Sequence, residues 1–240
     1  MFKRSKRSKL EEANILLGEA KVLGQQRKYQ EATETIEKAI ALFTQENDRQ
    51  KLDLSKALFY EFKAEQSIKS NRALEASNYL GRAGGFYMRL HMVNDLNRVY
   101  KKQADILLIL ARQTMKEKHF IEAASYFEQA AMAYQKLKNK EMELDCKAKS
   151  YVSRAAAEKT ISGRKVYLRK AVEIMQETGT DNPIIKGHLA YYNGLFIKEE
   201  KKEEALRYFS EALQNYQKAG MSKRVEEIKK MINDLVSSQI

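Results

Sequence analysis

The chain has 240 residues, of which 43% are apolar, with one proline, ten glycines and a formal net charge of +12. A chain of this size can bury a substantial core, and its small number of proline and glycine residues favours long helices over a sheet-rich fold. No apolar run reaches the roughly 18 residues of a membrane-spanning helix, and the basic start lacks the apolar stretch of a signal peptide. Because the lone Cys146 cannot form an internal disulfide, we expect a cytoplasmic protein.

The excess positive charge is concentrated at the start of the chain, over residues 1–9, and is spread thinly elsewhere. The five cations of this tail are Lys3, Arg4, Lys6, Arg7 and Lys9. Such a tail attracts anionic headgroups, RNA or an acidic partner, although basic runs are also common as flexible, solvated ends. We expect at most a weak contact of the tail with an anionic membrane, and the even spread of the remaining charge argues against a nucleic-acid-binding protein.

A first helical hairpin is predicted near residues 10–45. Ser8, with acidic residues three and four positions later, is typical of a helix start. After a short turn, apolar residues recur at steps of three and four from Ala32 to Phe43, which indicates a second, half-buried helix.

The same spaced signature recurs along the chain: a small residue, another twelve positions on, a large apolar residue four further, and an alanine three after that. Its members are Ala20/Ala32/Ile36/Ala39, Ala64/Ala76/Leu80/Ala83, Ala111/Ala123/Phe127/Ala130 and Asn193/Ala205/Phe209/Ala212. Small residues at this spacing let the two helices of a hairpin approach closely, and self-similarity of this kind indicates a helical repeat array.

The signature predicts further hairpins near residues 50–90, 95–137, 141–178 and 183–219, within a repeat domain over residues 10–220. In the fourth hairpin the signature decays to Val152/Arg164/Leu168/Ala171. An amphipathic helix within residues 222–240 is predicted to cap the end of the stack.

The segments 123–134 and 204–213 resemble the second helix of tetratricopeptide (TPR) repeats in their alternation of small and large residues. The length of the hairpins is similar to that in the soluble NSF attachment proteins (SNAP-like). The resemblance implies an all-α, right-handed superhelical solenoid of about five antiparallel hairpins. It also implies a protein-binding scaffold or adaptor, with the first helix of each hairpin on the concave face.

The chain shows no recognisable catalytic constellation. His91, His119 and His188 lie on different predicted hairpins, and no nucleotide-binding, zinc-protease or serine-hydrolase motif occurs. Gly81, Gly84 and Gly85 lie within a helical pattern, so we interpret them as positions of close helix packing rather than a phosphate loop. We therefore expect no enzyme, no cofactor and no metal site.

Most aromatic residues occur at helical steps among alanine and leucine, which is typical of a core. Four of them, Phe59, Phe62, Phe86 and Tyr87, are harder to bury together, and an exposed pair of these would form a partner-binding patch.

The candidate partner-binding residues lie on the predicted first helices, one face away from the packing alanines. They are Lys21, Glu61, Glu65, Lys69, Arg112, Lys116, Lys149 and Lys198. This mixed surface with a positive excess predicts binding of an acidic peptide or of the amphipathic or coiled-coil helix of another protein. Two alternatives are a trafficking adaptor that docks coiled-coil helices at membranes and a basic, RNA-associated repeat protein. Homo-oligomerisation is left open.

Overall fold

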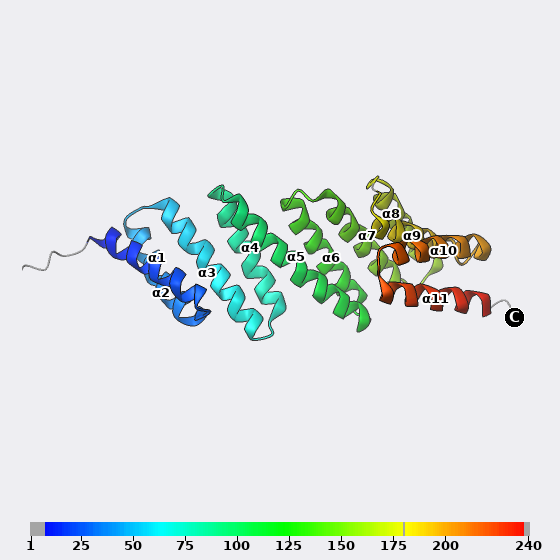
Figure 1. Ribbon diagram of the computed structural model, residues 1–240, viewed down its shortest axis with the longest axis horizontal. Helices are drawn as coiled ribbons and strands as arrows, with labels where there is room; N and C mark the ends of the chain where they lie inside the picture. The colour runs from blue at the N-terminus through cyan, green and yellow to red at the C-terminus, as the bar shows by residue number, and fades with distance from the viewer. Residues whose placement is uncertain (1–7, 180, 238–240) are drawn as a thin grey trace, which may run out of the picture. The chain divides into compact units, whose positions relative to one another are not determined.

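The computed structural model describes residues 8–179 and 181–237, and this part of the chain is all-α (Figure 1). Its helices are α1 (Lys9–Gln25), α2 (Tyr29–Gln45), α3 (Arg49–Lys69), α4 (Ala73–Arg89), α5 (Val93–Lys116), α6 (Phe120–Lys136), α7 (Lys140–Ala157), α8 (Ile161–Gln176), α9 (Pro183–Ile197), α10 (Lys202–Lys218) and α11 (Ser222–Ser237). Short turns join them, and neighbouring helices pack in series. The predicted fold class, an all-α series of helical hairpins, is confirmed.

The chain divides into two compact units, residues 1–110 and 111–240, with the division falling within α5. We call them the first unit and the second unit and describe each by itself. None of the described helices is both long enough and apolar enough to cross a lipid bilayer.

One turn geometry recurs between the helices. After α1, the amide of Arg27 donates to the carbonyl of Gly24 and the amide of Lys28 donates to that of Leu23, both at 3.0 Å, with Arg27 at φ 61°. This is the Schellman arrangement, in which one left-handed residue lets the last helical carbonyls find partners. Within residues 8–179 and 181–237, the left-handed positions that are not glycine are Arg27, Asn47, Asn71, His91, Lys118 and Lys138.

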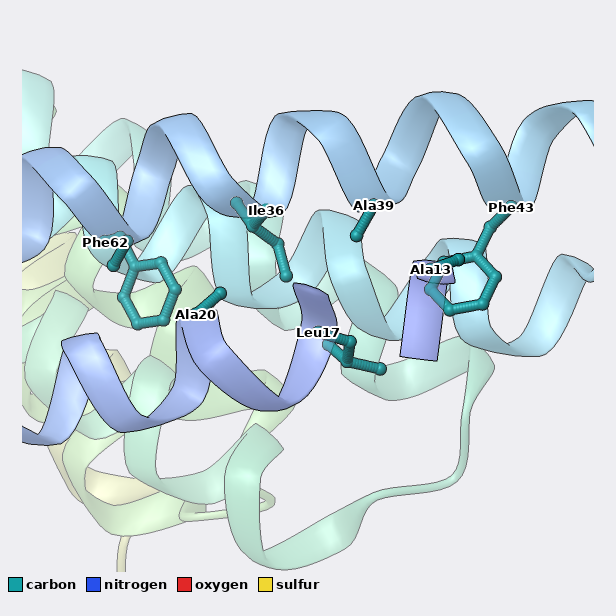
Figure 2. Close-up of a cluster of buried hydrophobic side chains, with 8 residues drawn as sticks. Ala13, Leu17, Ala20, Ile36, Ala39, Phe43 and Phe62 are labelled. Carbon is teal, nitrogen blue, oxygen red and sulfur yellow. The ribbon is translucent and has the colours of Figure 1, made fainter. Parts of the chain in front are cut away.

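In the first unit, the core between α1, α2 and α3 is built from the residues of the repeat signature. Ala20, Ala32, Ile36 and Ala39 are fully buried, and Figure 2 shows Phe62 of α3 reaching into the same cluster. The small side chains leave room for the large ones, so the helices close up as the signature predicts.

Close approach by glycine is used again where α4 meets α5. A Cβ at Gly84 would lie 2.7 Å from the ring of Tyr100, and one at Gly81 would lie 2.8 Å from the amide of Gln103. The interpretation as packing positions is therefore confirmed for these two residues. It is wrong for Gly85, where a Cβ would meet no atom within 4 Å because this position faces open space.

In the second unit, separate clusters of buried apolar residues join α7, α8 and α9, and α9, α10 and α11. Ile228 of α11 is 2% exposed and packs against the second of these clusters. On α9, Gly194 provides the close approach, since a Cβ there would lie 2.6 Å from the ring of Phe209, whereas its neighbour Asn193 is half-buried. The signature of the last hairpin is therefore displaced by one residue.

Candidate functional site

A groove of about 440 Å³ lies in the first unit, mainly between α1, α3 and the beginning of α5. Its lining comprises Lys21, Gly24, Gln25, Tyr29, Leu54, Leu58, Glu61, Phe62, Glu65, Tyr87, Met92, Asp95 and Arg98. The i, i+4 spacing of Leu54 and Leu58, and of Glu61 and Glu65, places each pair along one face of α3. The groove therefore combines apolar surface with charged groups.

Glu61 is the most buried charged residue of the groove, at 9% exposure. Its carboxylate accepts hydrogen bonds from the hydroxyl of Tyr87 and from the guanidinium of Arg98, whose Nη2 lies 2.9 Å from Oε1. The same Nη2 donates to Asp95 at 2.9 Å. Burial, followed by the Glu61 charge, raises the pKa of Tyr87, and the hydrogen bond to Glu61 raises the pKa of Arg98. These shifts keep Tyr87 neutral and Arg98 charged.

One turn further along α3, Glu65 forms an ion pair with Lys102 of α5. Both ion pairs join residues 37 positions apart, so Arg98 and Lys102 pair with Glu61 and Glu65 in the same register. We call these two pairs the α3–α5 ladder. They bind the carboxylates of Glu61 and Glu65 to cations of the same unit.

Lys21 differs from Arg98, the other cation that lines the groove, and from Lys69, which lies outside the lining. Its side chain is exposed and, within residues 8–179 and 181–237, it forms no ion pair or hydrogen bond. Lys69, by contrast, donates to the carbonyl of Arg27 at 3.0 Å and lies 4.7 Å from the ring centroid of Tyr29. The charge available to a partner in the groove is therefore that of Lys21.

The structure thus brings together Lys21, Glu61 and Glu65, while Lys69 lies against Tyr29, which also lines the groove. The candidates of the second unit are not part of its lining. Arg112 and Lys116 are exposed on the last turns of α5, Lys149 forms an ion pair with Asp145, and the ammonium of Lys198 lies 3.7 Å from Glu199.

Of the basic tail, Lys9 lies within the described residues, as the first residue of α1, and donates to Gln45 Oε1 at 3.1 Å. The other tail cations, Lys3, Arg4, Lys6 and Arg7, lie outside the described residues.

The aromatic residues named in the sequence do not form an exposed pair. Phe62 and Tyr87 are buried, at 7% and 1% exposure, whereas Phe59 and Phe86 are half-buried. Cations cover the latter two, with the Lys63 ammonium 5.5 Å from the Phe59 centroid and the Arg89 guanidinium 4.3 Å from that of Phe86. This region therefore offers a cation-covered surface rather than bare rings.

Sequence reasoning missed a buried polar cluster in the second unit. Nδ1 of His188 on α9 lies 2.8 Å from Oδ1 of Asp145 on α7, and the other carboxylate oxygen accepts from Lys149. Asp145 and His188 are 2% and 3% exposed. Burial opposes ionisation of Asp145, but the Lys149 charge and the His188 hydrogen bond hold its pKa below the usual range. Burial and the same lysine lower the pKa of His188.

Cys146, next to Asp145, is fully buried, and burial raises the pKa of its thiol to about 12. A thiol of this kind stays protonated and packs as a small apolar group. Among the described residues, no group of three or more His, Cys, Asp and Glu side chains is arranged to hold a metal ion.

Comparison with known proteins gives no family model and no curated protein that matches the chain. Two solved structures are similar along almost the whole length. One is a putative kinesin light chain with nearly identical TPR-like repeats from Podosopora anserina, at 15% identity and a TM-score of 0.30, covering 97% of this chain and 98% of that one. The other is BtubC (BKLC) from P. vanneervenii, at 15% identity and a TM-score of 0.29, covering 96% and 91%.

Proposed function

We propose that this protein is a non-enzymatic scaffold or adaptor that binds a segment of another protein in the groove of the first unit. The observation that carries this proposal is the combination of an open, partly apolar groove with a single uncommitted charge, Lys21. Ligand sites in proteins are typically concave and mostly apolar, with a few polar groups that fix orientation.

The apolar part of the groove fits a segment that presents large apolar side chains. Leu54 and Leu58 lie one helical turn apart on α3, and Phe62 follows one turn later. An amphipathic helix presents its own apolar residues at the same i, i+4 spacing, which is the usual pattern when a helix lies in a groove.

The charged residues of the groove indicate which charge a bound segment can carry. Glu61, Glu65 and Asp95 are all engaged by Arg98 or Lys102, so they are not available to a basic partner without breaking the α3–α5 ladder. Lys21 is available and lies at the α1 side of the groove. An acidic side chain beside apolar ones therefore fits better than a basic segment.

The proposal is tested by affinity purification from native extract with the tagged full chain, the Lys21→Glu variant and a control, Lys38→Glu. Lys38 is also exposed in the first unit but does not line the groove, so the control makes the same charge change elsewhere. We expect a protein partner retained by the native chain and Lys38→Glu, and depleted several-fold by Lys21→Glu. Equal retention by all three proteins would contradict the groove as the binding site.

A further inference from the structure

The second unit has a concave site of its own, on helices that do not contribute to the groove of the first unit. A pocket of about 340 Å³ is lined by one face of α6, by α7 and by α8. On α6 the lining residues Glu128, Ala131, Met132 and Gln135 follow the i, i+3, i+4, i+7 spacing of a single helix face.

The apolar wall of this pocket is partly open to solvent. Met132 is 62% exposed, and Ile174 and Tyr151 are half-buried opposite it. Methionine is flexible and polarizable, which suits surfaces that adapt to an incoming apolar group.

The carboxylates near the pocket are already neutralised from within the unit. Glu128 accepts from Ser150 at 3.0 Å and from Arg154 at 2.6 Å. Glu143, which is 5% exposed, faces two lysines, with Lys147 at 2.6 Å and Lys140 at 3.6 Å. These two carboxylates meet three cations, Arg154, Lys147 and Lys140, so this group of side chains carries one excess positive charge.

Lys170 adds a further cation at the edge of the pocket. Its ammonium lies 5.6 Å from the ring centroid of Tyr151, which lines the pocket, and it has no carboxylate partner in the described part of the unit. A positive edge around an apolar notch is complementary to an apolar side chain with a neighbouring carboxylate.

We infer that this pocket is a second docking site, which accepts an apolar side chain flanked by carboxylates from a protein partner. It is independent of the groove proposed above, since it shares no residue with it. Each unit then carries its own site, and the chain can hold two acidic–apolar segments at once.

The test uses two short peptides, acetyl-Glu-Leu-Phe-Glu-amide and its neutral counterpart acetyl-Gln-Leu-Phe-Gln-amide, and the full chain labelled with ¹³C at its methionine methyls. Met132 lines this pocket and Met92 lines the groove, so the two methyl signals report on the two sites separately. Met132→Leu and Met92→Leu variants assign the signals.

We expect the acidic peptide to shift the Met132 signal at lower concentration than the neutral one. Lys170→Gln is expected to weaken acidic-peptide binding at Met132 by about two- to fivefold, the effect of one exposed ion pair, and to leave the neutral peptide unchanged. Lys136→Gln, an exposed lysine of α6 outside the lining, is the matched control.

An unshifted Met132 signal, or equal effects of Lys170→Gln on both peptides, would overturn the inference. A shift at Met92 alone would overturn it while leaving the groove proposal intact. A shift at Met132 alone would support the second site and count against the groove.

Discussion

The two units place their interhelical polar contacts in different surroundings. In the first unit, Arg98 bridges Glu61 at the edge of an open groove, and its side chain remains 54% exposed. In the second unit, the side chains of Asp145 and His188 are 3% and 4% exposed and join α7 to α9 inside the fold. Water reaches Arg98 but little of Glu61 in the first contact, and it reaches neither partner in the second, so the first is screened more strongly.

Because of this difference, the α3–α5 ladder and the buried cluster of Asp145, Lys149 and His188 contribute differently to stability. The partly solvated ladder holds groove carboxylates in place at modest energy, whereas the buried cluster makes the second unit depend on each of its members. Removing one partner of a buried pair leaves an uncompensated charge, which is far more costly than losing a surface pair.

The largest effect is expected for Asp145→Asn, which leaves Lys149 and His188 without their shared acceptor charge. We expect the free energy of unfolding to fall by about 3–5 kcal/mol. The measurement is denaturant unfolding, with hydrogen exchange to locate the loss in the second unit.

Asp181→Asn provides the control for this substitution. Asp181 is fully exposed beside Lys186, and its replacement is expected to leave the free energy of unfolding nearly unchanged. Similar effects of the two variants would break the contrast between buried and exposed pairs.

Packing is expected to matter more than charge in the first unit. Gly84→Ala places a methyl against the ring of Tyr100 and should cost about 1–3 kcal/mol. Gly85→Ala on the same helix meets open space and should stabilise by up to about 1 kcal/mol, because alanine is the better helix former. Thermal unfolding of both variants checks the opposite signs, and a common sign would contradict the packing assignment.

The second unit should also respond to acid. The pKa of His188 is lowered in the folded state, so below about pH 6.5 the unfolded chain takes up a proton that the folded chain does not. The stability contributed by neutral His188 is therefore present above that pH and is lost as pH falls toward the lowered pKa, at up to about 1.4 kcal/mol per pH unit.

Unfolding free energies between pH 7.5 and 5 measure this slope. His188→Gln should flatten it, whatever its effect on stability at pH 7.5. A slope that survives in His188→Gln would show that another group carries the acid sensitivity.

The smallest effects are expected in the α3–α5 ladder. Arg98→Gln should cost about 1 kcal/mol, and Lys102→Gln less, because solvent reaches both cations and Glu61 keeps its hydrogen bond from Tyr87. Chemical denaturation of the two variants checks this, and a loss as large as that of Asp145→Asn would remove the distinction between the units.

The helical hairpins could be predicted because their signal lies in local spacing. Ala20, Ala64 and Ala111 are fully buried, as their recurrence with large apolar residues indicates. Cys146 is buried as well. The left-handed turn residues could not be predicted, because residues such as Lys118 and Arg27 are not the glycine or asparagine that usually occupies such a position.

The polar clusters could not be predicted because their members lie far apart in the sequence. In the sequence, Asp145 and Lys149 have the four-residue spacing of an ordinary surface ion pair on a helix. In the structure, His188, 43 residues from Asp145, contacts this pair inside the fold. Glu61 likewise has the spacing of a partner-binding residue, while its burial depends on Arg98 and Tyr87, which lie on other helices.

The most direct test of the proposed function is selection of binding peptides from a random library displayed on phage, using the full chain as bait and the Lys21→Glu variant for counter-selection. We expect enriched peptides with a carboxylate next to large apolar residues, which bind the native chain and Lys38→Glu but bind Lys21→Glu several-fold more weakly. Enrichment of basic peptides, or of peptides that bind all three proteins equally, would contradict the groove as an acidic–apolar docking site.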